Sequence, residues 1–251
     1  MNDTGICWAD KTWNPIVGCD GPDGKHCDYC YAYKLRGRLG SVLDCDDCRE
    51  FRPHLHPERL SGRRAPAATK TPQLVFADSM GDWWGENVHR HWRRDSLRAM
   101  NEAPWHTYVI LTKRPDLIWF AEIDRERRMN RLPPNLWLGV SVTGKDDWWR
   151  VDELGGVIYQ LNGAARGLVS VEPLTGIWDN SLSGVQEIDW VIIGPQSGPG
   201  GKIVQQPTFD AQRNAREWAE RCGAMVWEKD GLVGGKVQRR PGVGEDGGLT
   251  P

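Results

Sequence analysis

The stretch Thr107-Tyr108-Val109-Ile110-Leu111-Thr112 is followed directly by Lys113-Arg114-Pro115, so an uninterrupted apolar run ends at two basic residues and a proline. Such a run is typical of a strand that helices bury on both faces of a sheet. Similar runs, bounded by turn residues, recur along the chain. They predict strands at residues 13–18, 73–77, 107–112, 136–142, 167–171, 190–194 and 224–227.

Helical patterns lie between these runs. Apolar residues recur among polar ones at residues 87–101, 115–129, 146–161 and 209–221, and the last segment follows Thr208, a residue type that commonly caps helices. Strands that alternate with helices predict right-handed βαβ units and a parallel sheet. About six such units predict a partial (β/α)6 TIM-like barrel, an α/β fold whose active site lies at the carboxyl ends of the strands.

Two segments depart from this alternation. Residues 39–71 are rich in charge, proline and cysteine, which predicts a Cys-containing loop insertion. Residues 231–251 are rich in glycine and predict a loosely ordered C-terminal tail. Because the sequence shows no internal repeat and no sign of a separate second domain, we expect residues 1–230 to form a single domain.

The composition suits a globular protein, since 39% of the 251 residues are hydrophobic and 26% are charged. The net charge of −2 gives no general electrostatic argument for nucleic-acid binding. No apolar run approaches the roughly 20 residues that cross a bilayer, and residues 1–10 lack a signal pattern, so we expect a cytoplasmic protein without membrane contact. The pairs Trp83-Trp84 and Trp148-Trp149 either stack on a base or pack in the core.

Six of the seven cysteines lie within the first 48 residues, which favours metal ligation over buried thiols. Cys19, Cys27 and Cys30 form a C-x7-C-x2-C motif directly after the first predicted strand. Three thiolates on one loop can hold three irons of a [4Fe-4S] cluster and leave the fourth iron open to S-adenosylmethionine (SAM). Tyr29, between the last two cysteines, is then a candidate to lie against the adenine.

A zinc site is the alternative. Cys27-x2-Cys30 and Cys45-x2-Cys48 are separated by 14 residues, as in a four-cysteine zinc ribbon that contacts nucleic acid or a protein partner. That arrangement leaves Cys19 without a role, which favours the iron–sulfur cluster.

Cys45 and Cys48 form a candidate second metal site within the predicted insertion. To complete a zinc site they need two more ligands, and His54 and His56 are the nearest candidates. Because the other three cysteines already satisfy the cluster, we expect Cys45 and Cys48 to be free or peripheral thiols.

The chain resembles the radical SAM superfamily. More closely, it resembles a short phage-associated radical SAM-like family of unknown function, over about residues 8–229. Besides the cysteine loop, the similar segments are WADKTWNP (8–15), LHPERL (55–60), VFADSM (75–80), LTKRP (111–115), WLGVSV (137–142), SVEPL (170–174), DWVIIG (189–194) and SGPG (197–200). The superfamily usually has C-x3-C-x2-C, and the closer family has six residues in the first gap, whereas this chain has seven.

The resemblance implies an enzyme that reductively cleaves SAM to a 5′-deoxyadenosyl radical, which abstracts hydrogen from a substrate. It also implies a flavodoxin- or ferredoxin-type electron donor. The phage association implies a bacterial or phage-infected cell, and a nucleotide or nucleic-acid base as substrate.

Polar residues that follow the predicted strands are candidates to bind SAM. The resemblance implies that the segment after the second strand holds the methionyl amino group, and a cation suits the carboxylate. As alternatives, an acidic or hydroxyl residue there caps a helix, and an arginine pairs with a surface acid. The candidates are Asp78, Ser79, Lys113, Arg114, Ser141, Thr143, Glu172, Gln196 and Ser197.

Overall fold

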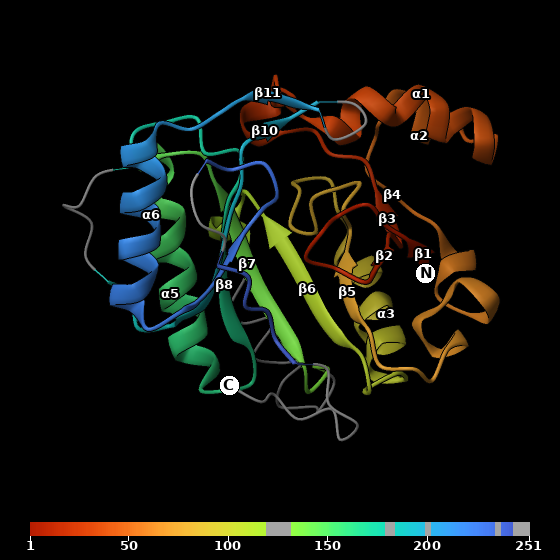
Figure 1. Ribbon diagram of the computed structural model, residues 1–251. Coiled ribbons are helices and arrows are strands. Elements are labelled where there is room, and N and C mark those ends of the chain that lie inside the picture. Colours follow the sequence, from red (N-terminus) through yellow and green to blue (C-terminus); the bar gives the residue numbers. More distant parts are fainter. Residues whose placement is uncertain (119–131, 179–183, 199–201, 234–236, 243–251) are drawn as a thin grey trace.

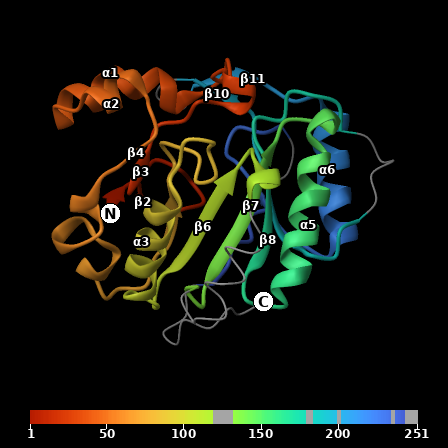
Figure 2. The same ribbon diagram turned by 180° about the vertical axis from the view of Figure 1, so that it is seen from behind.

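The computed structural model describes residues 1–118, 132–178, 184–198, 202–233 and 237–242, and its centre is one eight-stranded sheet (Figures 1 and 2). All neighbouring strands are parallel except the first pair, which is antiparallel. The strands lie in the order β1 (Asn2–Asp3), β2 (Lys11–Trp13), β5 (Leu74–Ala77), β6 (Thr107–Thr112), β7 (Leu136–Val142), β8 (Arg166–Val171), β9 (Ile188–Ile193) and β12 (Met225–Glu228).

This sheet confirms the predicted α/β fold with a parallel sheet. Because β1 and β12 lie at the two ends of the strand order, the sheet is not closed into a full barrel within the described residues. Six of the seven predicted strands match observed strands to within two residues at either end, and the first is discussed below.

Both faces of the sheet are buried, as the continuous apolar runs predict. Along β6, Tyr108 and Ile110 face one core cluster, whereas Val109 faces the other. The second cluster is built around tryptophans, and Trp190 makes edge contacts with Trp8 at 5.6 Å and with Trp137 at 5.9 Å between ring centroids. Large indoles therefore fill much of the core on this face of the sheet.

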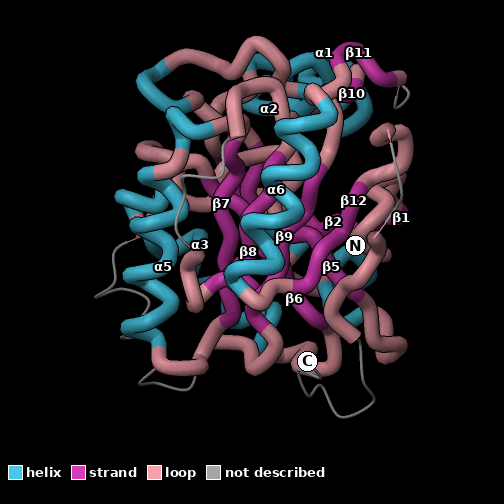
Figure 3. The backbone as a smooth tube through the Cα atoms, turned by 60° about the vertical axis from the view of Figure 1, so that its left-hand side comes forward, coloured by secondary structure: helices cyan, strands magenta, loops and turns pink. Residues whose placement is uncertain are grey.

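Helices cover the other face of the sheet (Figures 1 and 3). They are α3 (Arg90–Asn101), α5 (Trp149–Leu161) and α6 (Phe209–Cys222). As predicted, Thr208 caps α6, because its hydroxyl accepts a hydrogen bond from the Ala211 amide at 3.1 Å. Of the predicted helix at 115–129, the structure describes a 3-10 helix at Pro115–Leu117, and residues 119–131 lie outside the described part.

The first predicted strand, 13–18, is split in two. β2 ends at Trp13, and β3 (Ile16–Val17) pairs instead with β4 (His54–Leu55) in an antiparallel ribbon. Pro15 has no amide hydrogen to donate to a ladder, and the Asn14 side chain accepts hydrogen bonds from Ser79 and Met80. The prediction of one continuous strand is therefore wrong.

Across the carboxyl ends of the strands lie α1 (Tyr31–Leu43), α2 (Asp46–Glu50) and the strand pair β10 (Gln196–Ser197) and β11 (Ile203–Gln205), as Figure 1 shows. The predicted insertion at 39–71 is built of the end of α1, α2, β4 and three short 3-10 helices, rather than an irregular loop. α1 was not expected from a sequence with glycines at 37 and 40. Gly40 allows close packing, since a Cβ there would lie 2.2 Å from Arg49 Cγ.

Part of the predicted loose tail pairs with the sheet. The Glu228 amide donates to Val237 O, and the Arg239 amide donates to Val226 O, so residues 237–239 run along the free edge of β12. Residues 234–236 and 243–251 of the predicted tail lie outside the described part. No helix among the described residues is long and apolar enough to cross a membrane.

Candidate functional site

The loop that carries Cys19, Cys27 and Cys30 lies at the carboxyl ends of the parallel strands, between β3 and α1 (Figure 1). The Cys19 amide donates to Phe51 O at 3.1 Å, and its sulfur accepts from the Gly21 amide at 3.2 Å. Gly21 has a φ of 76°, and a Cβ at this position would lie 1.8 Å from Lys25 O. The loop therefore needs glycine where it turns back toward Cys27.

Cys30 begins the helix that follows. Its amide donates to Cys27 O at 2.9 Å, and its sulfur caps α1 by accepting from the Tyr33 amide at 3.3 Å. The Cys30 sulfur therefore lies at the amino terminus of α1.

The Cys19 thiol is held in its neutral form unless a metal binds it. Burial, with a smaller contribution from the Asp82 carboxylate, raises its pKa to about 12. The Gly21 amide and the Lys113 cation oppose this rise. Because a metal displaces the thiol proton on binding, ligation is the route by which Cys19 becomes a thiolate at neutral pH.

Lys113 is directed at this loop by a residue that the sequence did not single out. The Asp82 carboxylate accepts hydrogen bonds from the Thr112 hydroxyl at 2.6 Å and from the Lys113 amide at 2.9 Å, which joins the segments after β5 and β6. Lys113 Nζ lies 5.8 Å from the centroid of the Tyr29 ring. Two of the separately predicted candidates, Tyr29 and Lys113, are therefore brought together.

Asp78 and Ser79 support the chain beneath the loop. Asp78 is buried with a φ of 57°, and its Oδ1 accepts from the Ile16 amide at 3.1 Å, whereas its Oδ2 has no partner in the described part of the protein. Burial raises the pKa of Asp78 well above its ordinary value. The Ser79 hydroxyl donates to Asn14, and its carbonyl accepts from the Tyr31 hydroxyl.

The end of β7 contributes a second polar group to the rim. Thr143 donates to Asp147 Oδ2 through both its amide and its hydroxyl, each at 2.8 Å. Arg150 bridges Asp147 Oδ1 at 2.8 Å and the carbonyl of Ser141 at 3.0 Å. Burial raises the pKa of Tyr29, and Cys27 and Asp147 add to this effect, so Tyr29 lies between the cysteine loop and this group.

Glu172 also has a partner that sequence reasoning missed. Its carboxylate pairs with Lys229, which follows β12 directly. Gly194, at the end of the strand between them, leaves room for this pair, since a Cβ there would lie 2.8 Å from Lys229 Cδ and 3.2 Å from Glu172 Cδ. Lys229 lies at the end of the last predicted strand, a position that could have indicated it.

The remaining candidates lie in local structure. Arg114 Nε lies 3.9 Å from Asp116 on the following turn, as the alternative of an acid partner predicts. Gln196 and Ser197 form β10, where they pair with Gln205 and Ile203. The structure therefore does not join these three side chains to the group around Tyr29.

The two tryptophan pairs differ in burial. Trp83 and Trp84 are buried, so they belong to the core and are not available to stack on a base. Trp148 packs on the edges of Trp178 and Trp218 at centroid distances of 5.7 and 5.0 Å, whereas Trp149 is 44% exposed.

Cys45, Cys48, His54 and His56 form a second group of metal-ligand type. One ligand atom from each lies within 4.8 Å of all the others, and among the described residues this is the only such group of three or more His, Cys, Asp or Glu side chains. The structure therefore combines Cys45 and Cys48 with the two histidines rather than with Cys27 and Cys30, which rules out the four-cysteine ribbon. His54 and His56 are the two residues that the sequence offered as additional ligands for Cys45 and Cys48.

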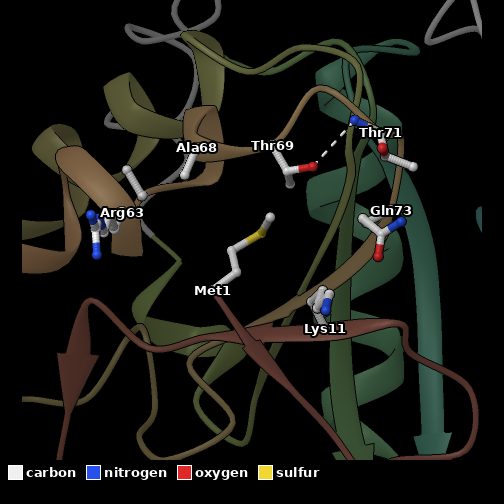
Figure 4. Close-up of a pocket in the computed structure, with 8 residues that line it drawn as sticks. Met1, Lys11, Arg63, Ala68, Thr69, Thr71 and Gln73 are labelled. Atoms are coloured by element: carbon white, nitrogen blue, oxygen red, sulfur yellow. Dashed lines mark hydrogen bonds between the residues drawn. The ribbon is translucent and has the colours of Figure 1, made fainter.

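A pocket of about 430 Å³ lies elsewhere, around Met1 and residues 63–73 (Figure 4). Lys11 begins β2 and Gln73 precedes β5, so this pocket lies at the amino ends of the strands. None of the candidate site residues lines it.

The family model described as "Protein of unknown function (DUF5131)" matches residues 3–227, so the chain belongs to that family. No curated protein matches the sequence. Among solved structures, the chain is similar to a cysteine-to-alanine mutant of spore photoproduct lyase, with a TM-score of 0.53 and 12% identity, over 91% of this chain and 79% of that one. A double mutant of the same enzyme, with bound AdoMet and dinucleoside spore photoproduct, gives a TM-score of 0.46 and 14% identity over 88% and 64%. At these identities the likeness shows the fold.

Proposed function

We propose that this member of the DUF5131 family is a radical SAM enzyme in which Cys19, Cys27 and Cys30 hold a [4Fe-4S] cluster. The observation that carries the proposal is the position of the three-cysteine loop at the carboxyl ends of the parallel strands. Parallel α/β folds build their active sites there. The fold is also similar to that of spore photoproduct lyase, a radical SAM enzyme.

The donor set suits a cluster better than a single ion. The three sulfurs do not gather within 4.8 Å of one another as the Cys/His group does. In a cluster each thiolate binds a different iron, so the sulfurs stand further apart than the ligands of one ion. The Gly21 amide donates to the Cys19 sulfur and the Tyr33 amide donates to the Cys30 sulfur, so the backbone already orients both sulfurs.

When bound, the cluster supplies the electron that splits SAM into methionine and a 5′-deoxyadenosyl radical for hydrogen abstraction from the substrate. The residues of the chain position SAM. Lys113 pairs with its carboxylate, and Tyr29 covers its adenine from the cysteine loop. Thr143, held by Asp147, presents its hydroxyl oxygen to the ribose. Glu172, paired with Lys229, is a further proposed SAM contact on this rim.

Asp78, Ser79, Arg114, Ser141, Gln196 and Ser197 remain proposed SAM contacts of the same rim. A buried side chain such as Asp78 contributes mainly by fixing the loop that precedes Cys19, because its Oδ1 is bonded to Ile16. The proposed substrate is a nucleotide or nucleic-acid base, and the proposed electron donor is of flavodoxin or ferredoxin type. Trp149 is the exposed aromatic available near Arg150 for stacking on a base.

The proposal is tested by anaerobic reconstitution with iron, sulfide, a reductant and SAM, with 5′-deoxyadenosine as the readout. We expect about four irons per chain and formation of 5′-deoxyadenosine. A reconstituted protein that binds SAM and iron but forms no 5′-deoxyadenosine would contradict the enzyme assignment. A colourless protein whose Cys19, Cys27 and Cys30 bind only zinc would contradict the cluster assignment.

A further inference from the structure

We propose that Cys45, Cys48, His54 and His56 form a closed structural zinc site that fixes the segment leading into Cys19. The motif is C-x2-C-x5-H-x-H, within the segment that joins α1 to the main sheet. This site is separate from the proposed cluster and does not depend on that assignment.

Three of the distances between the ligand atoms fall in the range of a tetrahedral site. His54 Nε2 lies 3.5 Å from Cys45 Sγ and 3.4 Å from Cys48 Sγ, and His56 Nε2 lies 3.3 Å from Cys48 Sγ. Tetrahedral zinc, with bonds of about 2.3 Å to sulfur and about 2.0–2.1 Å to nitrogen, places neighbouring ligand atoms roughly 3.3–3.8 Å apart. The two histidine nitrogens, at 3.0 Å, are slightly closer than this.

The outer hydrogen bonds orient both imidazoles toward one point. His54 Nδ1 lies 2.8 Å from the carbonyl oxygen of Arg52, and His56 Nδ1 lies 2.9 Å from Glu58 Oε1. Both partners accept hydrogen bonds, so a hydrogen on each Nδ1 satisfies them and leaves each Nε2 to bind a shared cation. The two Nε2 atoms lie 3.0 Å apart. A carbonyl or carboxylate behind a metal-binding histidine is the usual outer-shell partner.

Burial and ligand number make the site structural. Cys48 is fully buried and His56 is 7% exposed, whereas Cys45 and His54 are half-buried. Four protein ligands leave no open position for water or substrate, and two thiolates with two imidazoles are a typical structural zinc set.

The ligands are interleaved with the segment that leads into the cluster loop. His54 pairs with Val17 across β3 and β4, and the His56 amide donates to the carbonyl of Pro15 at 2.7 Å. Between the cysteines and the histidines, Phe51 O accepts from the Cys19 amide, so residues 51–56 contact the chain from Pro15 to Cys19. Gly18 permits this approach, since a Cβ there would lie 2.1 Å from Arg52 O.

The test is metal analysis in a background that cannot hold the cluster. A variant with Cys19→Ala, Cys27→Ala and Cys30→Ala should keep about one zinc per chain, because the four ligands of the site remain. Adding Cys48→Ala or His56→Ala should remove that zinc, whereas adding Cys7→Ala or Cys222→Ala should not. Cobalt in place of zinc should give visible thiolate-to-cobalt charge-transfer bands, which Cys45→Ala or Cys48→Ala removes.

A conservative variant separates metal binding from folding. His56→Cys supplies another zinc ligand, so it should retain zinc and shift the cobalt spectrum, whereas His56→Asn should lose the metal. Absence of zinc from the triple-alanine background after zinc supplementation would overturn the proposal. Retention of zinc in both Cys48→Ala and His56→Asn would also overturn it. Neither outcome depends on whether the parent protein forms 5′-deoxyadenosine, so the proposal can fail while the proposed function stands.

Discussion

The chain carries two cysteine-rich groups side by side in sequence, and they differ in how they are completed. Around Cys45 and Cys48 four ligand atoms lie within 4.8 Å, with hydrogen bonds behind both histidines. Among the described residues, Cys19, Cys27 and Cys30 do not belong to such a group, and their neighbours include Tyr29, Lys113 and Asp82.

On the two proposals made above, the groups would use a metal in two different ways. A group that supplies all four ligands holds its ion for stability, because nothing else can reach the metal. A group that supplies three thiolates and surrounds them with charged and aromatic side chains leaves room for a small molecule at the metal. We call Cys45, Cys48, His54 and His56 the closed group, and Cys19, Cys27 and Cys30 the open group. Since Phe51 O accepts a hydrogen bond from the Cys19 amide, the closed group also helps to position the open group.

The largest effect is expected from removing one of the three open-group thiols. Cys19→Ala, Cys27→Ala or Cys30→Ala should each abolish the bound cluster, a loss of about four irons per chain, and reduce 5′-deoxyadenosine to background. Zinc content should stay unchanged in all three. Iron and zinc analysis of the same samples makes the comparison, with Cys7→Ala and Cys222→Ala as controls that keep both metals. Iron retained in full by Cys19→Ala would show that its ligands lie elsewhere.

Removing the metal of the closed group should lower stability and, through Cys19, cluster loading. A site filled at a thousandfold excess over its Kd stabilises the fold by about 4 kcal/mol, so Cys48→Ala should lower the free energy of unfolding by roughly that amount. The measurement is urea unfolding of the cluster-free protein with and without a zinc chelator. The chelator should destabilise the parent and leave Cys48→Ala unaffected. Equal chelator effects on both proteins would show that the stabilising zinc lies outside this group.

Lys113 is the proposed partner of the SAM carboxylate beside the open group. Lys113→Ala should weaken SAM binding by roughly 10- to 150-fold with iron content intact, since one charge-assisted contact contributes about 1.5–3 kcal/mol. Calorimetric titration of SAM checks this. Lys70→Ala is a matched control, because Lys70 also lies over an aromatic ring, with its Nζ 3.6 Å from the Trp105 centroid, away from the cysteine loop. If Lys113→Ala binds SAM as the parent does, while Arg114→Ala does not, the carboxylate contact belongs to Arg114.

The sequence predicted the elements whose formation depends on local apolar patterning. The runs of β6 and β9 indicated buried parallel strands, and Thr208 marked the start of α6 correctly. The split after Trp13 was missed because it depends on Asn14 bonding to residues 65 and 66 positions away. α1 was missed because its glycines lower helix propensity, and the packing against Arg49 that compensates is a tertiary contact.

In the candidate site, too, local sequence patterns could be recognised, whereas contacts between distant residues could not. The C-x7-C-x2-C motif and Lys113 were candidates from the sequence alone, because each stands after an apolar run, and their roles stay predictions. Asp82 and Lys229 could not, since their roles come from Thr112 and Glu172, which lie 30 and 57 positions away. The histidines at 54 and 56 were identified as candidates, but only the pairing of β3 with β4 brings them to the two cysteines.

The smallest effect is expected at Asp78, which lies beneath both groups. Its Oδ1 accepts from Ile16 on β3, and the partner strand β4 carries His54. Burial raises the pKa of Asp78 well above 3.8, although the Ile16 amide and Arg59 oppose this rise. The folded protein therefore binds this proton more tightly than the unfolded chain does. The resulting stabilisation is complete at pH values below 3.8 and is lost as the pH rises through the pKa of the folded state.

Asp78→Asn keeps an acceptor for the Ile16 amide but cannot ionise. The difference in the free energy of unfolding, parent minus Asp78→Asn, should therefore fall as the pH rises, by about 1.4 kcal/mol for each pH unit by which the folded-state pKa exceeds the unfolded one. Urea unfolding of the metal-free proteins over a pH series measures it, and subtraction cancels the titration of the groups the two proteins share. Asp78→Ala removes the acceptor, so it should lose about a further 1 kcal/mol relative to Asp78→Asn at every pH. A parent-minus-variant difference that grows with pH would mean that Asp78 is ionised and paired with a cation in the folded protein, and would contradict the raised pKa.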